Sequence, residues 1–166
     1  EGGARRASTT DQGRLVDDPD FARKVDARRA RGQRTARENI ESLVDPGTFV
    51  EVGRLAVAQQ RKRRSLEDLI LRTPADGLIS GIATVNAGAF GAARARTAVV
   101  SYDFTVLAGT QGIASHKKCD RIVEMAIEQR IPMVWFCEGG GGRPGDTDGG
   151  GMIGNGLATR LWGLVG

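Results

Sequence analysis

The chain has 166 residues, of which 40% are hydrophobic and 27% charged. This length suits a single domain with a sizeable core, and the charges are spread too evenly to leave the ~20 consecutive apolar residues of a membrane-spanning helix. The net charge of +4 favours contact with anions, such as nucleic acid, an acidic membrane surface or a small polyphosphate.

The sequence offers few side chains that could bind a metal ion or form disulfides. His116 is the single histidine, and the two cysteines, Cys119 and Cys137, lack CxxC spacing. A structural zinc site needs about four such ligands, so no metal site is predicted. No disulfide framework is predicted either, and both thiols are expected to be reduced core residues. The chain starts at Glu1 without the apolar stretch of a secretory signal, which favours a cytoplasmic protein.

The first segments in chain order are a polar terminus and a helix. Residues 1–20 show no sustained apolar periodicity and are interpreted as a linker or frayed terminus. Ala, Arg, Lys and Glu dominate residues 21–44, and apolar residues recur there at three- and four-residue spacing. The pattern predicts one helix with a long solvated face, ended by Asp45-Pro46-Gly47.

A short strand over residues 48–52 is predicted next, followed by a basic run. The run, Arg61-Lys62-Arg63-Arg64, has no apolar face, so it is either a mobile loop or a short basic helix. Aromatic residues are scarce around it and in the basic stretch 23–37, so stacking platforms for nucleic acid bases are missing. Solvated basic faces are the expectation for both stretches.

Two strands are predicted in the middle of the chain. The composition of residues 73–77 predicts a turn, and the small and β-branched residues over 78–85 predict a strand after it. Asn86-Ala87-Gly88 resembles a hairpin turn, and a second strand is expected over residues 95–101. The sequence therefore predicts a ββ unit that leads into a helix.

That helix is the clearest one in the chain. Ser115 is the predicted cap, one apolar face continues to Gln129, and Ile131-Pro132 ends the helix. Residues 133–137 are apolar without alternation, which suits a strand covered on both faces in an α/β architecture. The predicted order is therefore ββα and then β.

A glycine run, Gly139 to Gly142, follows this strand directly, and twelve of the 24 glycines lie in the last 28 residues. Glycine allows backbone N–H groups to approach a ligand closely and to converge on an oxyanion. Removing the α-proton of a thioester places negative charge on its carbonyl oxygen, and each such donor is worth ~2.7–4 kcal/mol. The loop therefore predicts backbone catalysis that needs no histidine.

Other interpretations of these glycines are weaker. Gly149, Gly151 and Gly154 fit GxGxxG, but the match does not directly follow a strand, and the acidic residue expected ~20 positions later would lie beyond Gly166. No GK[ST] ending is present for a P-loop. A flexible glycine-rich loop without a ligand stays open on composition alone.

Four stretches resemble the carboxyltransferase subunits or domains of biotin-dependent acyl-CoA carboxylases. In order they are residues 36–51, 75–86, 103–110 and 138–148, and they include Asp103-Phe104-Thr105-Val106 and Glu138-Gly139-Gly140-Gly141-Gly142-Arg143. The last stretch departs from the commoner serine-glycine-glycine-alanine-arginine pattern and is similar to a glycine-rich version found in multidomain carboxylases.

The resemblance implies an α/β fold, a crotonase-like (ClpP/crotonase) spiral of ββα units that is incomplete in this chain. Residues 21–166 would form part of the amino-terminal domain, which binds coenzyme A, and the piece alone is expected to be inactive. Gly140, Gly141 and Gly142 match the oxyanion hole for the acyl-CoA enolate. Carboxybiotin would release carbon dioxide, the biotin anion would take the α-proton, and the enolate would attack the carbon dioxide.

The same resemblance implies further partners and contacts. Biotin would arrive on a carboxyl carrier, be charged by a biotin carboxylase component, and bind a homologous carboxyl-terminal domain of a partner subunit in a homo-oligomer. Arg143 is a candidate to steady the loop or to meet a CoA phosphate. Lys117 and Lys118 are candidates for a phosphate contact, and for all three residues the simpler expectation is a surface charge. For His116, packing or capping at the helix start is preferred.

Two alternatives stay open. Another crotonase-superfamily enzyme, such as a hydratase, isomerase or decarboxylase, would need a catalytic carboxylate, and Glu138 lies beside the loop in sequence. A structural role is preferred for Glu138, with its carboxylate accepting hydrogen bonds from the loop. A basic nucleic-acid-binding module would use the two arginine-rich stretches, but it leaves the apolar strand and the glycine loop unexplained.

Overall fold

The computed structural model describes residues 19–148. Its centre is one four-stranded sheet in the order β1-β2-β3-β4, formed by Val50–Glu51, Leu78–Thr84, Arg96–Tyr102 and Met133–Phe136. Strands β1, β2 and β3 are antiparallel neighbours, whereas β4 runs parallel to β3. Parallel neighbours need a crossover, and helix α6, Ile113–Gln129, provides it.

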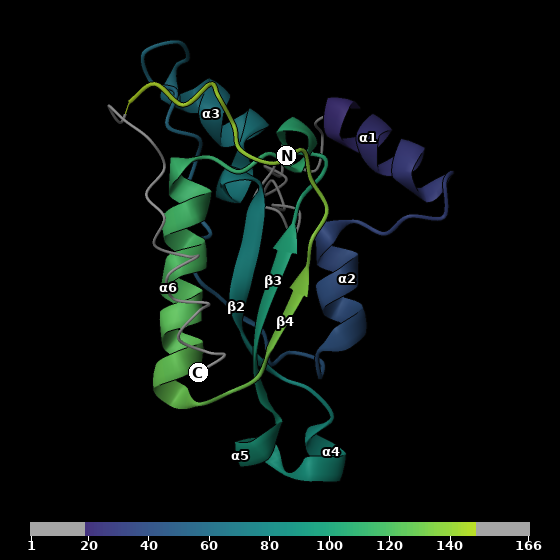
Figure 1. The fold of residues 1–166 in the computed structure, drawn as a ribbon. Helices are drawn as coiled ribbons and strands as arrows, with labels where there is room; N and C mark the ends of the chain where they lie inside the picture. Colours follow the sequence, from purple (N-terminus) through teal and green to yellow (C-terminus); the bar gives the residue numbers. More distant parts are fainter. Residues whose placement is uncertain (1–18, 149–166) are drawn as a thin grey trace, which may run out of the picture.

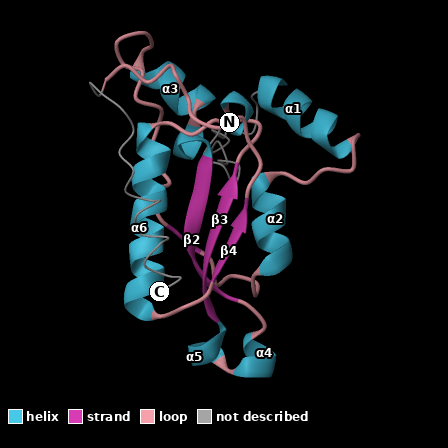
Figure 2. Ribbon diagram, in the orientation of Figure 1, coloured by secondary structure: helices cyan, strands magenta, loops and turns pink. Residues whose placement is uncertain are grey.

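Helices cover both faces of the sheet (Figures 1 and 2). The long helix α6 packs against Leu78, Ala98 and Val100 through Cys119 and Ile122. On the opposite face, α2 (Ala36–Leu43) packs its buried residues Ala36 and Ile40 against Ile79 and Val99. Successive strand residues therefore serve opposite layers, as the pleat requires. The result is a three-layer α/β arrangement.

The remaining helices lie at the two ends of the sheet (Figure 1). Helices α1 (Pro19–Arg29) and α3 (Leu66–Arg72) and the 3-10 turns η1 (Pro74–Gly77) and η2 (Leu107–Gly109) lie at the end where β3 and β4 finish. Two short helices, α4 (Ala87–Phe90) and α5 (Ala92–Ala95), lie at the other end. Across the described residues 19–148, no helix is both long and apolar enough to cross a membrane.

The paired strands and the following helix were predicted correctly, but their connection was not. Strands β2 and β3 pair along their full length, from Leu78 opposite Tyr102 to Thr84 opposite Arg96. The predicted tight turn at 86–88 is wrong, because α4 and α5 lengthen the connection. Asn86 takes a left-handed conformation, and the carboxylate of Asp45 accepts hydrogen bonds from the amides of Asn86 and Ala87 at 3.0 and 2.9 Å. That carboxylate stabilises the wider turn.

The single helix predicted over residues 21–44 is also wrong, because it is two helices. Thr35 starts α2 with a capping box: its hydroxyl accepts a hydrogen bond from the Glu38 amide at 3.2 Å, and the Glu38 carboxylate accepts one from the Thr35 amide at 2.7 Å. These bonds satisfy main-chain donors that a continuous helix would use otherwise. Helix α1 begins at Pro19, so residues 19 and 20 of the predicted linker are helical, and residues 1–18 lie outside the described residues.

Three smaller expectations need correction. Helix α6 begins after Gly112, and Ser115 lies inside its first turn, where its hydroxyl accepts a hydrogen bond from the Gly112 amide at 2.7 Å. Strand β4 is half-buried along its length rather than covered on both faces. Cys119 is buried as expected, but Cys137 is exposed. The apolar run did not distinguish an inner strand from an outer one.

Candidate active site

The glycine-rich loop, residues 137–148, follows β4 and lies against the segment that follows β3. Because these strands are parallel, both segments leave the same edge of the sheet (Figure 1). The Gly140 amide donates to the Ala108 carbonyl at 3.2 Å, and the Gln111 amide donates to the Gly141 carbonyl at 2.8 Å. The Arg143 amide then donates to the Gln111 carbonyl at 2.7 Å. The loop is therefore held by a main-chain ladder.

Two of the predicted oxyanion donors donate no hydrogen bond in this ladder. Gly141 and Gly142 are exposed, and no residue within 19–148 accepts a hydrogen bond from their N–H groups. Gly141 has a φ of 82°, which glycine adopts without steric cost. A β-carbon on either residue would meet nothing within 4 Å. The amide of Gly140, by contrast, is occupied by Ala108.

Arg143 lies beneath the loop rather than on the surface. Its side chain is only 4% exposed and forms an ion pair with Asp76, which is fully buried. The same guanidinium donates to the Thr110 carbonyl at 2.7 Å. Burial raises the pKa of Asp76, while the Arg143 guanidinium and the Ser115 amide act in the opposite direction. Of the two roles foreseen for Arg143, this geometry supports steadying the loop.

Protein carboxylates fill the amino terminus of α6. Asp76 accepts a hydrogen bond from the Ser115 amide at 2.7 Å, and Asp146 accepts one from the Ile113 amide at 2.8 Å. Negative groups at this end of a helix compensate its free N–H groups and its dipole. Asp146 belongs to the loop, so the helix start and the loop are tied together.

The two lysines of α6 differ in their surroundings. Lys117 is exposed. Lys118 is buried, contrary to the expectation of a surface charge, and its ammonium donates to the carbonyls of Ala75 (2.9 Å) and Leu78. Burial lowers the pKa of Lys118 to about 8. His116 is half-buried, and burial lowers its pKa too.

Glu138 is paired with an arginine that the sequence did not single out. Arg28 donates to both of its carboxylate oxygens, at 2.9 and 2.6 Å. The Glu138 carboxylate therefore accepts hydrogen bonds, but it accepts them from Arg28 rather than from the amides of the loop. The sequence placed Arg28 within a solvated basic stretch, whereas its side chain is 8% exposed.

Other arginines of the two basic stretches are paired as well. Arg37 forms an ion pair with Glu51 at 2.6 Å, with side chains 13% and 9% exposed. Arg64 pairs with Asp68 at 2.7 Å. These charges are partly neutralised within the fold, which weakens the case for an open nucleic-acid surface.

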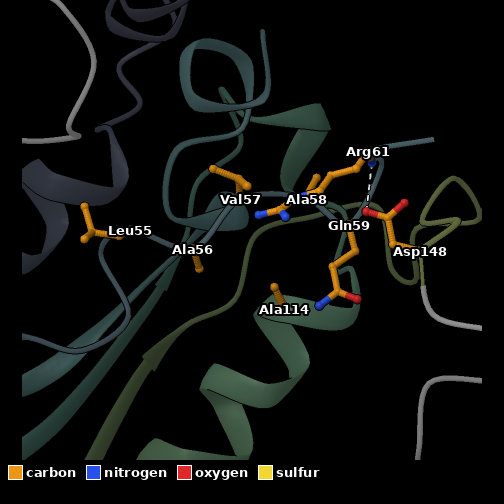
Figure 3. A pocket seen from close by; sticks show the side chains of 8 residues that line it. All are labelled: Leu55, Ala56, Val57, Ala58, Gln59, Arg61, Ala114 and Asp148. Atoms are coloured by element: carbon orange, nitrogen blue, oxygen red, sulfur yellow. Dashed lines mark hydrogen bonds between the residues drawn. The ribbon is translucent and has the colours of Figure 1, made fainter. Parts of the chain in front are cut away.

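A cavity of about 470 Å³ opens beside the start of α6 (Figure 3). The loop after β1 forms most of it, and Asp148 closes one side by accepting a hydrogen bond from the Arg61 amide at 2.8 Å. Its lining residues are Leu55, Ala56, Val57, Ala58, Gln59, Arg61, Ala114 and Asp148. The basic run is thus a turn that borders a cavity.

The GxGxxG match at 149–154 lies outside the described residues.

Comparison with known proteins agrees with this arrangement. A family model described as the carboxyl transferase domain matches residues 27–153. The chain belongs to this family, the carboxyltransferases of biotin-dependent acyl-CoA carboxylases. The resemblance read from the four sequence stretches is confirmed.

Several named proteins are similar to most of this chain. The propionyl-CoA carboxylase beta chain of Saccharopolyspora erythraea is 34% identical over 122 residues, or 73% of this chain and 20% of the relative. The methylmalonyl-CoA carboxyltransferase 12S subunit of Propionibacterium freudenreichii is 33% identical over 122 residues, or 73% of this chain and 21% of the relative. The chain therefore spans about a fifth of the length of these relatives.

Solved structures show the same fold. A single-chain, multi-domain long-chain acyl-CoA carboxylase is 54% identical with a TM-score of 0.82, covering 92% of this chain and 15% of that one. The transcarboxylase 12S structure, a hexamer with methylmalonyl-coenzyme A and methylmalonic acid bound, is 28% identical with a TM-score of 0.61. It covers 84% of this chain and 24% of that one.

Proposed function

We propose that this chain supplies the acyl-CoA side of a carboxyltransferase site, which moves a carboxyl group from carboxybiotin to the α-carbon of an acyl-CoA. The observation that carries the proposal is the pair of exposed glycines, Gly141 and Gly142, whose N–H groups have no acceptor within residues 19–148 and whose loop is held by the main-chain ladder. Family membership supplies the reaction class.

The two amides act where charge develops. As the α-proton leaves, the thioester carbonyl becomes an enolate oxygen, and preorganised N–H donors stabilise it more than they stabilise the ground state. Removal of one such donor from an oxyanion hole costs ~2.7–4 kcal/mol. The Gly140 amide already donates a hydrogen bond to the Ala108 carbonyl. We therefore assign the role of oxyanion donor to the Gly141 and Gly142 amides, and the role of positioning the loop to Gly140.

Carboxybiotin, delivered by a carrier, supplies the carboxyl group and the base. No acidic or basic side chain of the loop is needed for that chemistry. Glu138 is held by Arg28, which argues against its use as a general base in a hydratase or isomerase. We place the biotin site on the carboxyl-terminal domain of a partner subunit in a homo-oligomer, served by carrier and biotin carboxylase components.

We also propose that the described elements belong to a crotonase-like spiral. The order β2-β3-α6 forms one ββα unit, and β4 begins the next by pairing with β3 in parallel. The segments that follow β3 and β4 leave the same end of the sheet, where the glycine loop lies. Lys117, being exposed near the start of α6, is the lysine we retain for a CoA phosphate contact. The buried Lys118 is not suited to that role.

A matched pair of variants at Gly142 tests the proposal in the complete carboxylase assembly. Gly142→Pro removes the N–H donor, whereas Gly142→Ala keeps it and places its methyl group in open space. We expect carboxyl transfer to fall about 10²–10³-fold in the proline variant and to persist in the alanine variant, with acyl-CoA binding by calorimetry retained in both. A folded proline variant as active as the alanine variant would contradict the proposal.

A further inference from the structure

Arg28 joins three parts of the chain that are distant in sequence. It is one of the two buried residues of α1, and its guanidinium donates to the Arg34 carbonyl at 3.0 and 2.7 Å. The same group forms a two-pronged pair with Glu138, 110 positions along the chain, at 2.9 and 2.6 Å. The guanidinium carbon also lies 5.5 Å from the ring centre of Phe104. Arg28 therefore connects α1, the segment after β3 and the start of the glycine loop.

Glu138 is fixed at both its side chain and its main chain. Its carboxylate is held by Arg28, and its carbonyl packs so closely on Gly109 that a β-carbon there would overlap it. Gly141 follows three residues later. The planar fork of an arginine fixes the orientation of a carboxylate as well as its position. Arg28 and Gly109 therefore hold Glu138 at the point where the loop leaves β4.

From this geometry we infer that Arg28 is a positioning residue for the proposed oxyanion donors: by holding Glu138, it sets the placement of the Gly141 and Gly142 amides during carboxyl transfer. The inference rests on the proposed function. It predicts a loss of turnover rather than of acyl-CoA affinity, because the donors matter most when charge has developed on the substrate.

The test compares Arg28→Met, Arg28→Lys and Glu138→Gln in the complete assembly. A displacement of about 1 Å at a reacting centre costs roughly 10²-fold in rate, so we expect kcat per folded site to fall about ten- to a hundredfold in Arg28→Met. The lysine variant keeps the charge without the fork and should be intermediate. KM for acyl-CoA should change little. The double variant Arg28→Met with Glu138→Gln should be no worse than the poorer single variant, because both act through one contact.

Arg29→Met is the matched control. Arg29 is the next residue of α1 and pairs with Glu38 at 2.6 Å, away from the loop, so its loss should leave kcat unchanged. Wild-type kcat per folded site in Arg28→Met or Glu138→Gln, whatever their thermal stability, would overturn the inference. If Arg28→Met does not fold, Glu138→Gln decides, since that side chain is 36% exposed. A wild type without carboxyl transfer overturns the proposed function itself.

Discussion

Gly109 and Gly139 lie main chain against main chain, so that a β-carbon on either would overlap backbone atoms of the loop opposite. The contact joins the segment after β3 to the segment after β4 at the point where both leave the sheet. It explains why residue 139 is glycine even though its neighbours Gly141 and Gly142 have room for a β-carbon. Close approach is the reason for glycine here, whereas open space surrounds Gly141.

We predict that Gly139→Ala destabilises the domain by about 1–3 kcal/mol, the usual cost of inserting a methyl group into a packed contact. The free energy of unfolding from urea titration measures this. Gly88→Ala is the control, since that residue is exposed in α4 and a β-carbon there meets nothing within 4 Å. Equal stability of the two variants would show that the loops separate easily.

We predict a larger effect when the charge beneath the loop is removed. Arg143→Met leaves the carboxylate of Asp76 buried without its cation, which typically costs about 3–5 kcal/mol. Arg64→Met removes an arginine from a partly exposed pair with Asp68 and should cost less than about 1 kcal/mol. Chemical denaturation at neutral pH compares them. A loss in Arg143→Met as small as that in Arg64→Met would contradict the prediction.

The buried ammonium of Lys118 should make stability depend on pH. Burial lowers its pKa from 10.5 to about 8, with Glu51 and Asp76 partly opposing the shift. Between these values the unfolded chain binds more protons than the folded one, so stability rises with pH across that window. Relative to Lys118→Met, the wild type should gain up to about 3 kcal/mol between pH 7 and pH 10.5.

Urea unfolding of both proteins at several pH values measures this difference directly. Groups common to the two, such as Tyr102 and Cys119, contribute similarly to each and largely cancel. A stability difference that stays constant from pH 7 to pH 10.5 would contradict the prediction.

Local patterns in the sequence predicted the elements that depend on local chemistry. The small and β-branched residues before Asn86 and after Ala95 form β2 and β3, and the apolar face before Ile131 forms α6. The break between α1 and α2 was missed although Thr35 and Glu38 have capping-box spacing, because helix-forming residues on both sides dominated the interpretation. An apolar strand such as β4 has the same composition at an edge as in the centre of a sheet.

The candidate site was predicted only in part. The glycine loop was found because glycine is conspicuous, and the family resemblance supplied its chemistry. Arg143 was foreseen as a support of the loop, but its partner Asp76 and the pair of Arg28 with Glu138 were not, because these pairs join residues 67 and 110 positions apart. A charged residue in a basic stretch looks the same in sequence whether it faces water or a distant carboxylate. Only the fold determines which partner it meets.

The position of the β2–β3 connection has a practical consequence for labelling. This connection, residues 85–95, carries α4, α5 and the exposed Phe90, and it lies at the end of the sheet away from the loops after β3 and β4 (Figure 1). A fluorophore or affinity tag inserted there would be separated from the glycine loop by the length of the sheet. The connection is therefore the natural attachment point for a label that leaves the loop undisturbed.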